Sequence, residues 1–379
     1  MAGANREWLV EQFIEFTSLD SESFHEKAVA AKLKPMLEAL GFDVIEDNAA
    51  ERCGSECGNI YGFLKGNADK KPVLLSAHMD TVKPGLGKKP HIITDEEGRE
   101  RIVSDGTTVL GGDDVCGIVE ILDAVRMAKE DPEGHGDIEV LFTVAEETNG
   151  DGARSFDYSR IKSHDAYVID LTGSPGHAAN AAPSIISFTI KITGKAAHAG
   201  FEPENGINAL QAAASAISKI QQGRLSPEMT LNIGTISAGI QTNIVPGECV
   251  CKGEVRGLDH EATLSAAKKV GETFRAEAEK IGASCDFDYT VHIRAYRTSE
   301  DAEVSKCFRR ACKTMGLPGN LVPTHGGSDN NMFAEKGIDG LVVSCGMQNV
   351  HATDEFALVE DLVTGAELIA AIIRERKPL

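Results

Sequence analysis

Apolar and polar residues follow two patterns along this chain, one typical of helices and one typical of strands. Residues 5–19 and 23–41 carry apolar side chains at spacings of three and four, and the second segment ends at Gly41, as helices often do. Strand-like and helical segments then alternate: strands at 42–47, 58–66 and 72–80, a helix at 115–131, and strands at 138–147 and 166–170. Strands separated by helices predict an α/β fold whose functional residues lie at one edge of the sheet.

The middle of the chain, residues 184–294, has a different order of elements. We expect strand 187–194, helix 207–223, strands 230–239 and 248–258, helix 260–282 and strand 284–293. This β-α-β-β-α-β order is the ferredoxin-like split motif. The sequence therefore predicts an inserted α+β domain at 184–294 and a catalytic domain with a mixed sheet at 1–183 and 295–379, which agrees with a length of 379 residues.

Acids and histidines stand where several apolar runs end. They are His78 and Asp80, Asp113 and Asp114, Glu146 and Glu147, Asp170, and His351. A lone acid at such a position is more often a helix cap or a solvated loop residue, and a lone histidine is no stronger a signal. Five segments that each bring carboxylate or imidazole to one edge predict a single polynuclear metal site. His78 and Asp80 share one face of an extended segment, so one can bind metal while the other orients it.

The residue types indicate the metal and the reaction. Imidazole and carboxylate without thiolate suit Zn²⁺, with Mn²⁺ and Co²⁺ as alternatives, and an acid shared by two ions lets them lie about 3.5–4 Å apart. Two close cations lower the pKa of a bridging water to about neutrality, and an unligated glutamate nearby can accept its proton. Hydrolysis of an amide or peptide bond follows most naturally, whereas no basic phosphate-binding cluster supports a phosphoester substrate.

Several motifs carry a family resemblance. In chain order they are SAHMDTV, GGDDVCGI, VAEETNGDGA, AAHAGFEPENGINAL, GGSDNNMF and NVHATDEF. They resemble the di-zinc metallopeptidases that include aminoacylase, the glutamate carboxypeptidases and peptidase T, and most closely the peptidase T branch. The resemblance implies an exopeptidase that hydrolyses di- or tripeptides with two Zn²⁺ per chain. It also implies that the inserted domain is a lid through which two chains form a homodimer.

The resemblance assigns five metal ligands. Two bind one zinc, two bind the other and one bridges both: His78 with Asp170, Glu147 with His351, and Asp113. Glu146 matches the general base that takes a proton from the bridging water. Asp80 matches the residue that holds the imidazole of His78 in the correct tautomer.

A substrate site is implied by the same resemblance. His198 polarises the substrate carbonyl or holds its carboxylate, and Arg256 anchors a carboxylate with two hydrogen bonds. Asn243, Gly327 and Ser328 match further positions that contact substrate. The alternatives are a histidine at a helix N-terminus, an asparagine in a turn and an arginine on a strand surface.

Two departures from the family leave the substrate class open. Val115 stands where peptidase T and many relatives carry lysine, and GGSDNNMF resembles carboxypeptidases and aminoacylases at least as much as tripeptidases. An N-acyl amino acid deacylase or a carboxypeptidase with the same centre is therefore the alternative enzyme. Outside the enzymes, the alternative is a metal-stabilised protein without catalysis, which has no need of Glu146.

Composition limits the partners and the compartment. A formal net charge of −20 argues against nucleic acid and against an anionic membrane as partners. No apolar run approaches the roughly 18 residues of a membrane span, and the N-terminal residues lack the pattern of a signal peptide. The cysteine count is nine, an odd number. We expect a cytoplasmic enzyme with reduced thiols that acts on short peptides or N-acyl amino acids.

Overall fold

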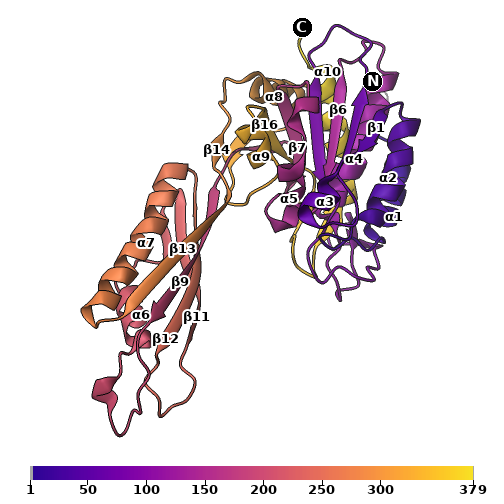
Figure 1. Ribbon diagram of the computed structural model, residues 1–379. Coiled ribbons are helices and arrows are strands. Elements are labelled where there is room, and N and C mark those ends of the chain that lie inside the picture. The colour runs from indigo at the N-terminus through magenta and orange to yellow at the C-terminus, as the bar shows by residue number, and fades with distance from the viewer. Residues whose placement is uncertain (1–2, 379) are drawn as a thin grey trace. The chain divides into compact units, whose positions relative to one another are not determined.

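The computed structural model describes residues 3–378, which form two compact units (Figure 1). Unit 1 comprises the chain up to Ala181, Thr298–Thr324 and the chain from Ser328 onward. Unit 2 comprises Ala182–Arg297 and His325–Gly327. Each unit has a hydrophobic core of its own.

Unit 1 is built on a mixed sheet. Its strands are β1 (Asp43–Glu46), β2 (Ile60–Leu64), β3 (Val73–His78), β6 (Ile138–Thr143), β7 (Asp165–Leu171), β8 (His177–Ala182), β15 (Asn320–Pro323) and β16 (Asp339–Ser344). They lie in the order β1-β2-β6-β3-β7-β16-β8, with β15 also paired to β8. The strands β6, β3, β7 and β16 are parallel to one another, whereas β2 and β8 run antiparallel to their neighbours β6 and β16. The carboxyl ends of the parallel strands therefore share one edge, where α/β folds place their sites.

Each face of this sheet packs against a separate hydrophobic core. The larger core also contains residues of α1 (Arg6–Thr17), α2 (Lys27–Ala39), α4 (Gly112–Glu130), α8 (Glu303–Met315) and α10 (Val359–Arg374). On the other face, Phe333 of α9 (Asn330–Glu335) contributes to a smaller core. Leu75 belongs to the larger core and its neighbour Leu74 to the smaller one, because side chains alternate along a strand. Burial on both faces explains why β3 reads as an unbroken apolar run.

Short elements complete unit 1. They are α3 (Ala49–Cys53), α5 (Asp151–Ser155), the 3₁₀ turns η1 (Glu146–Thr148) and η2 (Tyr158–Arg160), and an antiparallel sheet of β17 (Met347–Gln348), β18 (Phe356–Leu358), β5 (Glu100–Val103) and β4 (His91–Thr94). The sequence patterns did not predict the small sheet. Its strands have only two to four residues, which is too short for a period-two pattern to stand out.

Unit 2 is an antiparallel sheet with two helices on one face (Figure 1). Its elements are β9 (Ser184–Thr193), η3 (Pro203–Asn205), α6 (Ala209–Ile217), β10 (Gly223–Ser226), β11 (Met229–Ala238), β12 (Glu248–Gly257), α7 (His260–Lys280), β13 (Ser284–Ile293) and β14 (Tyr296–Arg297). The sheet order β10-β11-β12-β9-β13 is the ferredoxin-like order with β10 added at one edge. In β9, buried Ile190 and Ile192 alternate with exposed Thr189 and Lys191. The predicted fold class is confirmed.

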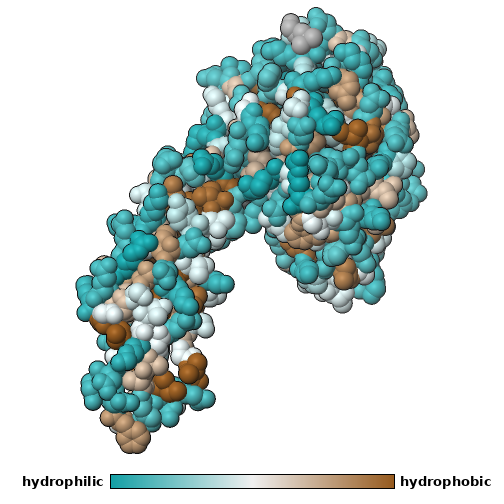
Figure 2. Space-filling view, in the orientation of Figure 1, coloured by the Kyte–Doolittle hydropathy of each residue, from teal (hydrophilic) through white to brown (hydrophobic). Residues whose placement is uncertain are grey.

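The surface is largely hydrophilic, with separate small hydrophobic patches on the face shown in Figure 2. Among the described residues, Phe201 and Ile240 are the most exposed large apolar side chains, at 85% and 80%, and both lie in loops of unit 2. No helix within residues 3–378 combines the length and the apolar character needed to cross a membrane.

Gly117 in α4 has no room for a side chain. A Cβ at this position would lie 2.3 Å from the main-chain oxygen of Ile169 in β7 and 2.7 Å from Asp114 Oδ1. We expect Gly117→Ala to lower the free energy of unfolding by about 1–3 kcal/mol in urea denaturation, because backbone must move. Gly234→Ala is the control, since its Cβ would meet only the flexible side chain of Asn232, at 3.3 Å. Equal losses in the two variants would contradict this account of α4 packing.

Candidate metal centre

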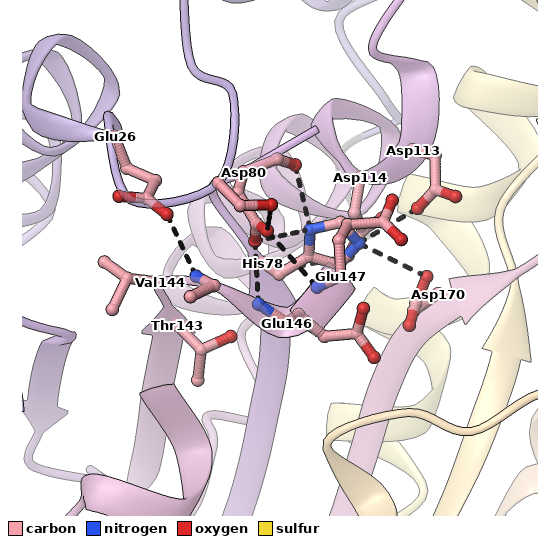
Figure 3. A network of polar contacts seen from close by, with 12 residues as sticks. Glu26, His78, Asp80, Asp113, Asp114, Thr143, Val144, Glu146, Glu147 and Asp170 are labelled. Carbon is pink, nitrogen blue, oxygen red and sulfur yellow. Dashed lines mark hydrogen bonds and ion pairs between the residues drawn. The ribbon is translucent and has the colours of Figure 1, made fainter. Parts of the chain in front are cut away.

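Acidic and imidazole side chains meet at the carboxyl ends of β3, β6 and β7 (Figure 3). His78 is the last residue of β3, and Asp170 is the next to last residue of β7. Glu146 and Glu147 open the 3₁₀ turn η1 after β6, and Asp113 lies at the start of α4. Residues from four separate segments converge because parallel strands end at one edge of the sheet.

Asp113 lies between two histidines. Its Oδ1 is 2.9 Å from His78 Nε2, and its Oδ2 is 3.2 Å from His351 Nε2. Asp170 Oδ1 lies 3.7 Å from His78 Nε2, and Glu147 Oε1 lies 3.0 Å from His351 Nε2. The structure thus forms two groups that share one acid, and within each group the ligand atoms lie within 4.8 Å of one another: His78, Asp113 and Asp170; and Asp113, Glu147 and His351. A carboxylate with one oxygen toward each group has the arrangement of a bridge between two ions.

The electrostatics of this cluster suit cations. Burial raises the pKa of Asp170 to about 7 and raises the pKa of Glu147 as well. Hydrogen bonds to Asp113 and Glu147 raise the pKa of His351 to about 10. Burial opposes the charged form of His78, yet Asp113 and Asp170 raise its pKa well above the usual range. Closely spaced carboxylates create this negative environment, and their oxygens together with imidazole nitrogens are donors that Zn²⁺, Mn²⁺ and Co²⁺ accept. The residues present therefore fit a metal centre.

Asp114 stabilises the same edge of the sheet by accepting main-chain hydrogen bonds. The Asp113–Asp114 peptide bond is cis, and Asp114 is almost fully buried. Its Oδ2 accepts a hydrogen bond from the main-chain N–H of His78 at 3.1 Å, and its Oδ1 accepts one from Gly117 at 3.1 Å. Asp114 therefore joins the start of α4 to the end of β3.

Asp80 contacts both His78 and the turn η1. The Nδ1 atom of His78 lies 3.0 Å from the main-chain oxygen of Asp80 and 3.3 Å from its Oδ1. The carboxylate also accepts the main-chain N–H groups of Glu146, at 2.9 Å, and Glu147, at 3.2 Å. The contact with His78 is the one that the sequence suggested. The sequence analysis missed the other contact, in which the carboxylate of Asp80 binds main-chain N–H groups of the turn η1.

Glu355 is another buried acid that the sequence analysis missed. Its Oε2 accepts the N–H groups of Leu110 and Gly111 at 2.7 and 2.8 Å, and its Oε1 accepts that of Asp113 at 3.0 Å. Because Glu355 follows His351 by four residues, it ties the loop of His351 to the loop of Asp113. The signal in the sequence was an acid inside the motif NVHATDEF, directly before a short apolar strand.

Glu146 lies beside the cluster without belonging to either ligand group. Burial raises its pKa well above the usual range, and the negative charges of Asp170 and Asp329 act in the same direction. Figure 3 shows its carboxylate on the same side of the turn as Asp170. A carboxylate with a raised pKa next to a metal cluster is suited to accept a proton from water.

Four of the five predicted substrate residues lie in unit 2, and Ser328 lies in unit 1. The Nδ1 atom of His198 accepts the N–H groups of Gly200 and Phe201 at 3.1 and 3.2 Å. The main-chain oxygen of Asn243 accepts the N–H of Ala199 at 2.9 Å, so Asn243 and His198 occupy adjacent loops.

Arg256 lies in β12 and forms an ion pair with Glu254, with Nε 2.8 Å from Oε1. Its Nη1 reaches the main-chain oxygen of His325 at 3.5 Å. Gly327 is exposed and belongs to unit 2, whereas Ser328 is buried in unit 1. The main-chain N–H of Ser328 donates to Asn331 Oδ1 at 3.0 Å, so this residue holds the start of α9.

Comparisons with known proteins place the chain in a family. The family described as the peptidase dimerisation domain matches residues 180–282, and peptidase family M28 matches residues 59–220. The structure of the aminopeptidase PepT from Bacillus cereus ATCC 10987 is 36% identical, has a TM-score of 0.93, and aligns over 98% of this chain and 99% of its own. The structure of a tripeptidase from Staphylococcus aureus subsp. aureus Mu50 is 30% identical, has a TM-score of 0.94, and aligns over the same shares. The uncharacterized protein YqjE of Bacillus subtilis (strain 168) is 36% identical over 98% of this chain and 99% of its own length.

The fold and the site define a metallo-exopeptidase. The chain belongs to the PepT-like M20 metallopeptidases, which confirms the family resemblance seen in the sequence motifs.

Asp113 belongs to both ligand groups and Asp170 to only one. Removing the carboxylate of Asp113 should therefore lower the metal content of the protein more than removing that of Asp170. We expect chelator-treated Asp113→Ala, reloaded with Zn²⁺ and desalted, to retain less metal per chain than Asp170→Ala. Atomic emission measures the content, and the wild type reloaded in parallel sets the scale. Equal retention in the two variants would contradict a bridging position for Asp113.

Proposed function

We propose that the enzyme is a zinc-dependent aminopeptidase that hydrolyses di- and tripeptides, with two Zn²⁺ per chain. The observation that carries this proposal is the position of Asp113, whose two oxygens face two histidines in separate ligand groups beside buried Glu146. The aminopeptidase and tripeptidase named among the relatives support the substrate class.

The proposed ligands divide as the two groups do. His78 and Asp170 would hold one ion, Glu147 and His351 would hold the other, and Asp113 would be shared by both. When bound, the ions supply Lewis-acid activation of water and of the scissile carbonyl. The chain holds the ligands in place through Asp80, Asp114 and Glu355, whose carboxylates bind main-chain N–H groups of the ligand segments.

Glu146 is the proposed general base. Its position outside both ligand groups leaves its carboxylate available to accept a proton from water and to return it to the leaving amine. Burial raises the pKa of Glu146, which favours its protonated form, the form that the second transfer requires. A role limited to holding metal would not explain a buried glutamate at this position.

Substrate contacts are proposed for five residues outside the ligand groups. His198 and Asn243 lie in adjacent loops of unit 2, and Arg256 presents a guanidinium that already pairs with a carboxylate, that of Glu254. A substrate carboxylate would replace Glu254 as its partner. Gly327 and Ser328 complete the set.

A homodimer and a cytoplasmic location belong to the same proposal. The match of residues 180–282 to a peptidase dimerisation domain supports self-association through unit 2. All nine cysteines are free thiols, which suits a reducing compartment.

Replacing Glu146 tests the proton transfer separately from metal binding. We expect Glu146→Gln to lower kcat for a tripeptide by about 10²–10⁴-fold, the usual contribution of a general base. Bound zinc per chain should equal that of the wild type, because Glu146 is not a proposed ligand. Glu147→Gln is the matched comparison and should lose zinc. Turnover that persists in Glu146→Gln would remove this residue from the mechanism.

A panel of substrates tests the class and the terminus. Di- and tripeptides with a free amino end should be cleaved, and the same peptides should resist after N-acetylation. Chelation of the metal should abolish cleavage, and added Zn²⁺ should restore it. Chromatography of the products measures each rate. Preferential hydrolysis of N-acetyl amino acids would instead identify a deacylase.

A further inference from the structure

The turn that carries Glu146 and Glu147 begins at a strained residue. Ala145 adopts φ +50° and ψ 42°, the left-handed conformation that residues other than glycine rarely adopt. Strained backbone of this kind persists only where surrounding groups hold it. The main-chain N–H groups of three successive residues, beginning with Ala145, each donate a hydrogen bond to a buried carboxylate. Those of Glu146 and Glu147 bind Asp80, and that of Ala145 binds Glu26 Oε1 at 3.0 Å.

Glu26 is fully buried and has a partner on each oxygen. Its Oε1 also accepts the N–H of Phe24 at 2.7 Å, and its Oε2 accepts the hydroxyl of Ser55 at 2.6 Å. Phe24 is itself left-handed, with φ +76°. One carboxylate therefore binds two left-handed residues that lie in different segments, the N-terminal loop and the turn after β6.

Glu26 reaches the turn from outside the ligand cluster. In the view of Figure 3 it lies on the opposite side of the turn from Asp113 and Asp170, and it belongs to neither ligand group. The residue before the turn has its own anchor, since the N–H of Val144 donates to Asn59 Oδ1 at 3.0 Å. Loss of Glu26 would thus leave the end of β6 in place and remove the anchor of Ala145, while Asp80 still binds the N–H groups of Glu146 and Glu147.

We propose that Glu26 is a positioning residue for catalysis, which fixes the direction of Glu146 by binding the N–H of Ala145. The inference rests on the proposed role of Glu146 as base. Without Glu26 the buried N–H of Ala145 has no acceptor, and the turn relaxes toward a negative φ that aims Glu146 elsewhere. A displacement of about 1 Å at a catalytic group can lower the rate roughly 100-fold.

The hydrogen bonds of Glu26, rather than its charge, perform this task. A glutamine at this position can keep Oε1 as acceptor for both N–H groups, while its amide donates to the hydroxyl oxygen of Ser55. Glu26→Gln should therefore keep most of the wild-type kcat, whereas Glu26→Ala should lose it.

The chain offers a matched control in Glu139. This fully buried glutamate has the same kinds of partners as Glu26, since it accepts the hydroxyl of Tyr61 at 2.6 Å and the N–H groups of Lys162 and Ser163 at 3.0 and 2.7 Å. It lies near the start of β6, away from the carboxyl edge. Truncation of either glutamate removes an equivalent set of hydrogen bonds, so a general loss of stability should be similar.

The experiment measures kcat and KM for a tripeptide, normalised to folded, zinc-loaded enzyme. We expect Glu26→Ala to lower kcat about 100-fold with KM little changed, and Glu139→Ala to retain the wild-type kcat. Equal effects of the two truncations on kcat would overturn the proposal. If Glu26→Ala does not fold, Glu26→Asp decides, since its shorter side chain cannot keep both N–H groups, and a wild-type kcat in that variant would also overturn the proposal.

A second arm tests the link to Ala145. Glycine has no penalty in the left-handed region, so Ala145→Gly combined with Glu26→Ala should recover about tenfold in kcat relative to Glu26→Ala alone. No recovery would mean that Glu26 does not act through Ala145. The wild type in the same assay separates the two proposals: absent tripeptide hydrolysis there would reject the proposed function, whereas wild-type activity with an unimpaired Glu26→Ala would reject the role of Glu26 alone.

Discussion

Hydrogen bonds from main-chain N–H groups to buried carboxylates hold the metal centre together. Asp80 and Glu26 bind the turn of Glu146, and Glu355 binds the loop of Asp113. A hydrogen bond to a charged group contributes about 1.5–3 kcal/mol, whereas a left-handed alanine costs about 1–2 kcal/mol. One such bond is therefore enough to offset the strain at Ala145, and the turn stays where the site needs it.

The hydrogen bonds from main-chain N–H groups also reduce the electrostatic cost of gathering buried carboxylates in one site. A metal site of this kind gathers several carboxylates in one buried place, where burial and their mutual repulsion raise the pKa values of Asp170 and Glu146. Cations bound at the ligand groups would offset this repulsion, and peptide N–H groups offset the charge of the supporting acids. The acids that bind N–H groups are thus part of the site, although they belong to neither ligand group.

Departures from the family pattern concern the surroundings of the centre. Val115, at the position where the family resemblance implied lysine, has its side chain buried in the larger core of unit 1. An ammonium group at that position would face apolar neighbours, so α4 packs here as a hydrophobic helix directly after the two aspartates. Next to this residue, Glu355 binds the N–H of Asp113, and Asp114 accepts the N–H groups of His78 and Gly117.

The sequence by itself determined the fold class, the order of most helices and strands, and the residues that converge at the sheet edge. Period-two and period-3.6 patterns are local, and the acids after β3, β6 and β7 had to meet once those strands were parallel. The tertiary structure alone decided that the two oxygens of Asp113 face different histidines, and that Glu26 and Glu355 bind N–H groups of remote loops. Such contacts join residues far apart in the chain through single backbone atoms, and a main-chain N–H leaves no mark on the pattern of side chains.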